Sequence, residues 1–174
     1  MKKGQMMSQP FIYIFALILG ALILVWGVKV IYDLVSVGVD VEVGKFYKDV
    51  ESRAGEFSNY EEGALTNIPV TISSGKITHV CVFDPGKEID CKIKLKSGEL
   101  SGCGRLLDQD FMFVLESEAE NLERAKNLYF MPLDAAELTQ FRVKELKPAG
   151  ANPLCYINGA KMILTSKITH VEAS

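Results

Sequence analysis

The chain has 174 residues, enough for one modest domain, and its hydrophobic fraction of 48% is higher than a small water-soluble fold usually carries. The formal net charge is −3, and residues 33–174 alone carry 16 basic and 22 acidic side chains, a formal charge of −6. An acidic surface repels phosphate backbones, so we do not expect nucleic acid as a partner.

The N-terminal segment contains an apolar run that is long enough to cross a membrane. No charged residue occurs between Phe11 and Val28, and at about 1.5 Å per residue such a helix spans most of a hydrocarbon core roughly 30 Å thick. Trp26 and Tyr32 lie at one end of the span, where aromatic rings favour the headgroup level. A run with no polar face is unusual in a soluble core. We therefore predict a cytoplasmic tip and a transmembrane helix over residues 1–32, with the lipid bilayer as its partner.

The charges around the run predict its orientation. Lys2 and Lys3 precede it, whereas the first acidic residue, Asp33, follows it. The positive-inside rule then places the N-terminus in the cytoplasm and residues 33–174 outside the cell membrane, as a single-pass protein. A cleaved secretory signal has a shorter apolar region and a small-x-small site, neither of which is found here, so we expect a permanent anchor.

The residues before the run, Lys2-Lys3-Gly4-Gln5, resemble the class III signal of archaeal type IV pilin-like proteins, the pilins and archaellins. The resemblance implies that a prepilin-type peptidase cuts between Gly4 and Gln5 and that the apolar helix stays on the mature protein. It also implies a pilus-type homo-oligomer assembled through this helix. The alternative is a signal-anchor whose lysines only set topology. The opening also resembles that of small archaeal single-span membrane proteins, which implies no activity.

One position departs from the pilin pattern. The family often has an acidic residue at the fifth mature position, and this chain has Gln9 there, followed by Pro10. The resemblance implies that the acid neutralises a neighbouring subunit's N-terminus during assembly, whereas a glutamine can only hydrogen-bond. Pro10 is compatible with the first turn of a helix. The sequence therefore supports processing more strongly than polymerisation.

Residues 33–58 fit two periodicities. The valines at 35, 37, 39, 41 and 43 alternate, which taken alone predicts a strand. A helical stripe runs through the same segment and continues where the alternation fails, and no turn separates it from the apolar run. We predict an amphipathic stalk helix over 33–58. Its stripe consists of Val35, Val39, Val43, Phe46, Val50, Ala54 and Phe57.

Residues 59–174 follow a polar, turn-rich boundary and are mostly typical of strands. We predict a hairpin between 76–84 and 88–96, joined at Asp84-Pro85-Gly86, and a second hairpin at Asn158-Gly159. Further strands are expected at 110–116, 127–133 and 140–146, with a short helix from Ser117 to Lys126. The predicted fold class is α+β: a long N-terminal helix and a mostly antiparallel β-rich domain, either a sandwich or a curled sheet.

The β-rich domain contains four cysteines and no Cys-x-x-Cys pair, so zinc-ribbon and thioredoxin-like motifs are absent from the sequence. An even number in an outward-facing domain predicts disulfides. We favour Cys81–Cys91, because a three-residue loop would place these residues opposite each other in the first hairpin, and Cys103–Cys155 by elimination. The alternative is that Cys81 and Cys91 are buried, reduced thiols.

Both histidines occur in a repeated pentapeptide, at His79 and His170. Two converging histidines would suit a metal ion, but no acidic residue stands at ligand spacing, and we favour two similar strand segments. Phosphate-binding loops, nucleophile elbows and His-Glu-x-x-His motifs are missing from the sequence. The glutamates at 116, 118, 120 and 123 suit a solvated helix face better than paired carboxylates. We therefore expect no catalytic, cofactor-binding or metal residues.

The remaining function classes differ in what the β-rich domain does outside the membrane. We expect a non-enzymatic structural or assembly subunit of pilin-like type. The alternative is a signal-anchored binding or accessory module of the cell envelope that does not polymerise. An envelope enzyme is the least favoured of the three.

Overall fold

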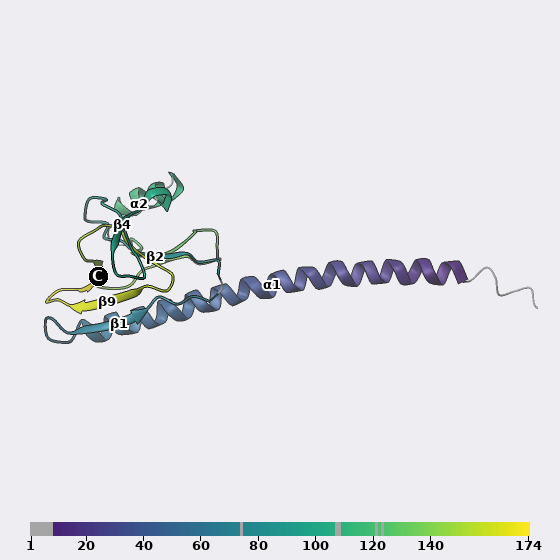
Figure 1. Cartoon of the computed structure of the whole chain (residues 1–174), viewed down its shortest axis with the longest axis horizontal. Coiled ribbons are helices and arrows are strands. Elements are labelled where there is room, and N and C mark those ends of the chain that lie inside the picture. Colours follow the sequence, from purple (N-terminus) through teal and green to yellow (C-terminus); the bar gives the residue numbers. More distant parts are fainter. Residues whose placement is uncertain (1–8, 74, 107–108, 121, 123) are drawn as a thin grey trace, which may run out of the picture. The chain divides into compact units, whose positions relative to one another are not determined.

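The computed structural model describes residues 9–73, 75–106, 109–120, 122 and 124–174. The chain divides into two compact units, Met1–Gly38 and Val39–Ser174. Helix α1 (Gln9–Phe57) contributes residues to both units (Figure 1). The first unit is described only by its part of α1, and the second holds the rest of α1 and all of the strands.

In the first unit, most side chains of α1 are apolar, and apolar side chains are exposed on every side of the helix. Leu17, Leu24 and Trp26 are each more than 70% exposed, and so are residues on the other helical faces. None of the most apolar 18-residue window is buried, and by length and composition α1 qualifies as a membrane-spanning helix. The predicted helix is confirmed, and its uncovered apolar surface differs from that of a soluble core helix.

In the second unit, the apolar stripe of α1 is buried from Val39 onward. The exposed fractions of Val39, Val43, Val50 and Ala54 are 1% or less, whereas Val41 between them is 48% exposed. Only a helix places residues spaced by three and four on one side, so the helical interpretation of this segment is confirmed. We expected a stalk over 33–58 and a separate β-rich domain from 59; the structure groups Val39–Phe57 with the strands.

The strands form two sheets that are mostly antiparallel, as predicted. One has four strands in the order β1-β9-β10-β7 and the other has six in the order β4-β3-β8-β2-β5-β6. Among the strand pairs of the described residues, only β10–β7 and β3–β8 are parallel. The strands are β1 (Leu65–Pro69), β2 (His79–Val82), β3 (Lys92–Lys94), β4 (Leu100–Gly102), β5 (Leu128–Met131), β6 (Gln140–Phe141), β7 (Leu146–Pro148), β8 (Leu154–Ile157), β9 (Lys161–Ser166) and β10 (Val171–Ala173).

Two apolar clusters cover the opposite faces of the six-stranded sheet. Alternate residues of β2, β5 and β8, such as Val80, Phe130 and Tyr156, join the stripe of α1 and the four-stranded sheet in the larger cluster. The residues between them, such as Cys81 and Tyr129, join helix α2 (Gln109–Ala119) in the smaller one. Figure 1 shows α2 and the part of α1 in this unit on opposite sides of the strands. Burial on both faces explains why 128–131 is apolar without alternation.

The strand predicted at 110–116 is wrong, because these residues lie in helix α2. Phe111 and Leu115 are one helical turn apart and both fully buried, whereas Phe113 between them is 73% exposed. A strand would have put all three on one face. The helix predicted from Ser117 to Lys126 is also displaced, since α2 ends at Ala119 and the Glu118 carboxylate accepts the backbone N–H of Lys126 beyond it.

The hairpin predicted between 76–84 and 88–96 does not form. The turn is present, with the Lys87 N–H donating to the Asp84 carbonyl, but β8 lies between β2 and β3. Strand β3 instead forms a hairpin with β4. The local turn signal was therefore correct, but the pairing was decided by a strand more than sixty residues further along the chain.

The hairpin predicted at Asn158-Gly159 does not form either. Gly159 has the positive φ of 94° that favours glycine in a turn, but β8 and β9 on its two sides belong to different sheets. The Asn158 amide instead binds the backbone of Ile72, donating to its carbonyl and accepting its N–H. The turn thus leads the chain from one sheet to the other.

Candidate functional site

The predicted processing site, Gly4 and Gln5, lies outside the described residues. The described helix begins at Gln9. What the structure adds is the exposed apolar surface of α1 that follows, which is the most extensive apolar surface among the described residues. Large patches of this kind mark membrane or protein contact sites.

All four cysteines form disulfides, but the pairing that we favoured is wrong. The bonds are Cys81–Cys155, with Cα atoms 3.9 Å apart, and Cys91–Cys103, with Cα atoms 5.8 Å apart. Strand β8 lies next to β2, and in that register Cys81 is directly opposite Cys155. In an antiparallel hairpin, the residue numbers of directly opposed residues have a constant sum. In the β3–β4 hairpin Lys92 faces Gly102, so the next position outward pairs Cys91 with Cys103.

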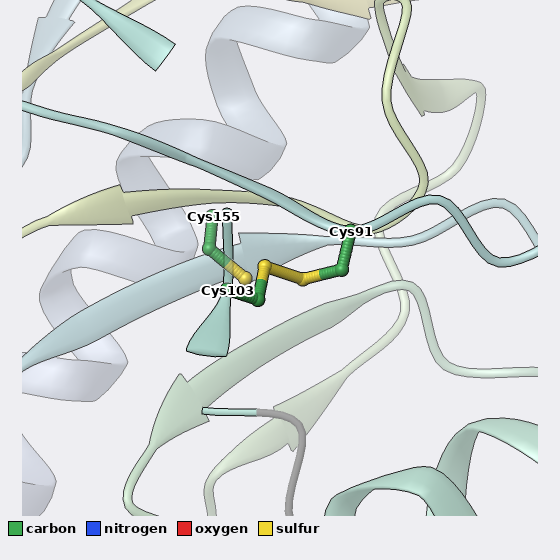
Figure 2. Close-up of side chains that lie close together, drawn as sticks. All are labelled: Cys91, Cys103 and Cys155. Carbon is green, nitrogen blue, oxygen red and sulfur yellow. A yellow bond between two sulfur atoms is a disulfide. The ribbon is translucent and has the colours of Figure 1, made fainter. Parts of the chain in front are cut away.

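The two disulfides lie next to each other. The Sγ atoms of Cys91, Cys103 and Cys155 are all within 4.8 Å of one another, and Figure 2 shows the Cys155 sulfur beside the Cys91–Cys103 bond. Within the described ranges this is the only group of three or more potential metal ligands. Each sulfur is already bonded to another sulfur, so the group holds no free thiolate to bind a metal.

The two repeated histidines have similar local contacts and lie at the starts of strands in different sheets. His79 Nδ1 lies 2.9 Å from the hydroxyl of Thr78, and His170 Nδ1 lies 3.0 Å from that of Thr169. His79 starts β2, and burial lowers the pKa of its imidazole. His170 precedes β10, where its Nε2 lies 3.4 Å from the Glu172 carboxylate. Neither belongs to a group of three ligands among the residues described.

A cavity of about 320 Å³ opens beside the turn at Asp84. The Asp84 carboxylate is buried and accepts the N–H of Gly86, and Lys147 Nζ lies 3.3 Å from it. The Asn152 side chain accepts the Asp84 N–H and donates to the carbonyls of Asp84 and Lys87. These polar groups form hydrogen bonds and an ion pair with one another, so the arrangement stabilises a turn rather than presenting free groups to a substrate.

Other ionisable groups of the second unit also have structural roles. Glu116 and Glu120 are exposed, as expected for a solvated face. Burial raises the pKa of Tyr129 and of Tyr156 far above the usual value, so both phenols stay neutral. The hydrogen bond from Lys48 holds the pKa of the Glu51 carboxyl below its usual value in a surface cluster on α1.

The sequence did not predict the role of Asn152 or the close approach of the two disulfides. Asn152 precedes Pro153 in a loop, and nothing nearby in the sequence indicates that its amide binds a turn almost seventy residues earlier. The disulfide arrangement depends on the insertion of β8 between β2 and β3. No protein-family model, curated protein or solved structure matches this chain.

Proposed function

We propose that this chain is a single-pass membrane protein that presents its β-rich unit outside the cell and acts as a non-enzymatic, pilin-like structural or assembly subunit. The observation that carries the proposal is the change in α1 at Val39. Before Val39, apolar side chains are exposed around the whole helix. From Val39 onward, the apolar side chains form one stripe, which is buried against the strands of the second unit. The first pattern suits lipid or packed helices, and the second suits a folded domain.

The orientation rests on charge and on the disulfides. Lys2 and Lys3 stand before the apolar run and Asp33 after it, which favours a cytoplasmic N-terminus. Both disulfides lie in the second unit, and disulfides persist in oxidising compartments outside the cytoplasm. These two independent observations both favour a position of the second unit outside the cytoplasm.

The pilin-like role rests on the start of the chain and on the use of α1. The stretch Lys2-Lys3-Gly4-Gln5 resembles a class III signal, which implies cleavage by a prepilin-type peptidase and a mature N-terminus at Gln5. Helix α1 carries an apolar segment and then packs its later residues on strands, which is the arrangement that the resemblance implies. The exposed apolar segment supplies a surface for homo-oligomers.

Two observations favour the second candidate, a signal-anchored binding or accessory module. Gln9 lacks the charge that the family's acid supplies. The stripe from Val39 to Ala54 is covered by its own unit, so this part of α1 offers no further apolar face to a neighbouring subunit. In this candidate the bond between Gly4 and Gln5 stays intact, and the β-rich unit meets an envelope partner.

Cleavage of the bond between Gly4 and Gln5 is expected for the first candidate and not for the second. We would isolate the full chain from native membranes and measure its intact mass, together with the variants Gly4→Leu and Ser8→Leu. The pilin-like proposal expects the wild type and Ser8→Leu to begin at Gln5, and Gly4→Leu to keep the first four residues. Ser8→Leu is the matched control, because it adds the same side chain on the other side of the bond. A wild type that keeps Lys2 and Lys3 would support the signal-anchored module instead.

A further inference from the structure

The two adjacent disulfides differ in their access to solvent. Cys81 and Cys155 are fully buried, whereas Cys91 is partly exposed and Cys103 is 6% exposed. The buried bond lies in the smaller apolar cluster, packed with Phe83 and Tyr129. A thiol must reach a sulfur atom in order to reduce its disulfide, so an external thiol can attack the outer bond in the folded protein but cannot attack the inner one.

We propose that the Cys91–Cys103 disulfide is the entry site for an external dithiol reductant, and that it passes the reducing equivalents on to the buried Cys81–Cys155 disulfide by thiol–disulfide exchange. The proposal rests on the mutual approach, within 4.8 Å, of the Cys91, Cys103 and Cys155 sulfurs (Figure 2). It does not depend on whether the chain is pilin-like.

The exchange balances with one dithiol. A thiolate of the reductant attacks the Sγ of Cys91, the more exposed residue of the outer bond, forms a mixed disulfide with it and releases Cys103 as a thiolate. The Cys103 thiolate attacks Cys155 Sγ, which breaks the Cys81–Cys155 bond, forms Cys103–Cys155 and releases Cys81, which takes up a proton. The second thiol of the reductant then closes on its first sulfur and releases Cys91. The dithiol loses two electrons, and the protein gains two thiols, at Cys81 and Cys91.

The position of Cys103 favours this order of events. Cys103 follows directly after the edge strand β4, whose three residues are all exposed. Its release therefore frees only the end of a three-residue strand, whereas Cys155 is held within β8 between β2 and β3. A sulfur at the end of an exposed edge strand can approach a fixed sulfur at lower cost than the reverse, because segments with few buried contacts open most easily. The product bond would join this edge strand to the centre of the sheet.

The direct test follows all four sulfurs during partial reduction. The full chain in detergent micelles is treated with one equivalent of dithiothreitol under native conditions, quenched with an alkylating agent at intervals, and mapped by mass spectrometry. We expect alkylation of Cys81 together with Cys91, and a peptide pair linked through Cys103 and Cys155. If only Cys91 and Cys103 become alkylated while Cys81–Cys155 stays intact, the proposal is wrong.

A variant without the outer disulfide provides the second test. Cys91→Ser/Cys103→Ser keeps the buried bond but removes its route, so with excess dithiothreitol we expect Cys81–Cys155 to be reduced at least about tenfold more slowly than in the wild type. Equal rates would overturn the proposal. If the variant unfolds, its buried bond is reduced quickly and circular dichroism reveals the loss of structure; the decision then rests on the wild-type mapping.

Discussion

Replacing Val50 by alanine tests whether the later part of α1 is a structural element of the β-rich unit. Val50 is fully buried in the larger apolar cluster. The substitution removes two methyl-sized groups, which at about 0.8 kcal/mol each plus a cavity term costs about 2–3 kcal/mol. Alanine's better helix propensity offsets about 0.5 kcal/mol of this. We therefore expect the free energy of unfolding to fall by about 2 kcal/mol.

The matched control is Val41→Ala, the same change on the same helix at a side chain that is 48% exposed. It should alter the free energy of unfolding by no more than about 0.5 kcal/mol. The assay is urea unfolding of the full chain in detergent micelles with its disulfides intact, followed by the near-ultraviolet circular dichroism of the buried tyrosines. Equal effects of the two substitutions would refute the packing of α1 on the strands.

Three further predictions concern the turn, the pH dependence and the membrane segment. Asn152→Ala should lower the free energy of unfolding by about 2–3 kcal/mol, because it leaves several buried backbone groups unpaired, whereas the exposed Asn59→Ala just after the end of α1 should cost less than about 1 kcal/mol. Burial holds the pKa of Tyr129 above that of a phenol in the unfolded chain. The contribution of Tyr129 to the free energy of unfolding should therefore be fully present below about pH 10 and be lost as the pH rises further. In Tyr129→Phe the free energy of unfolding should fall less steeply over this range. Leu22→Arg, which places a charge in the apolar run, should cost about 3 kcal/mol of membrane insertion and reduce the share of protein that sediments with carbonate-washed membranes; an unchanged share would argue against α1 as the anchor.

The sequence predicts the elements of this protein well where the pattern is long and local. The apolar run before Gly38 is long and uncharged enough for a membrane helix, the stripe from Val39 to Ala54 follows the helical period, and the structure has a helix at each. The choice between strand and helix for the alternating valines was decided by Phe46 and Val50, which continue the helical spacing. Long periodic segments leave little room for tertiary contacts to change the outcome.

Pairing between strands could not be predicted from the same patterns. Asp84-Pro85-Gly86 and Asn158-Gly159 both make the turns that their residues favour, yet neither closes a hairpin. The turn sequence specifies where the chain reverses, whereas β8 pairs with β2 and β3 because its two faces are needed by two different apolar clusters. That requirement involves residues far apart in the sequence, and no local signal expresses it.

The cysteines illustrate the consequence for the candidate site. Cys91 pairs within a β3–β4 hairpin that was not recognised, because β3 and β4 have three residues each. Once Cys91 is bonded to Cys103, Cys81 is left with Cys155 across β2 and β8. The presence of disulfides followed from the even number of cysteines, but their partners depended on the strand order.

The most direct test of the central claim, a membrane anchor with the β-rich unit outside, is the labelling of surface amines on intact cells. Lys144 lies in that unit, and its side chain is 89% exposed. A membrane-impermeant, amine-reactive reagent should label Lys144 in intact cells to the same extent as in lysed cells, in protein that sediments with the membranes. Labelling of Lys144 only after lysis would place the unit in the cytoplasm and contradict the account.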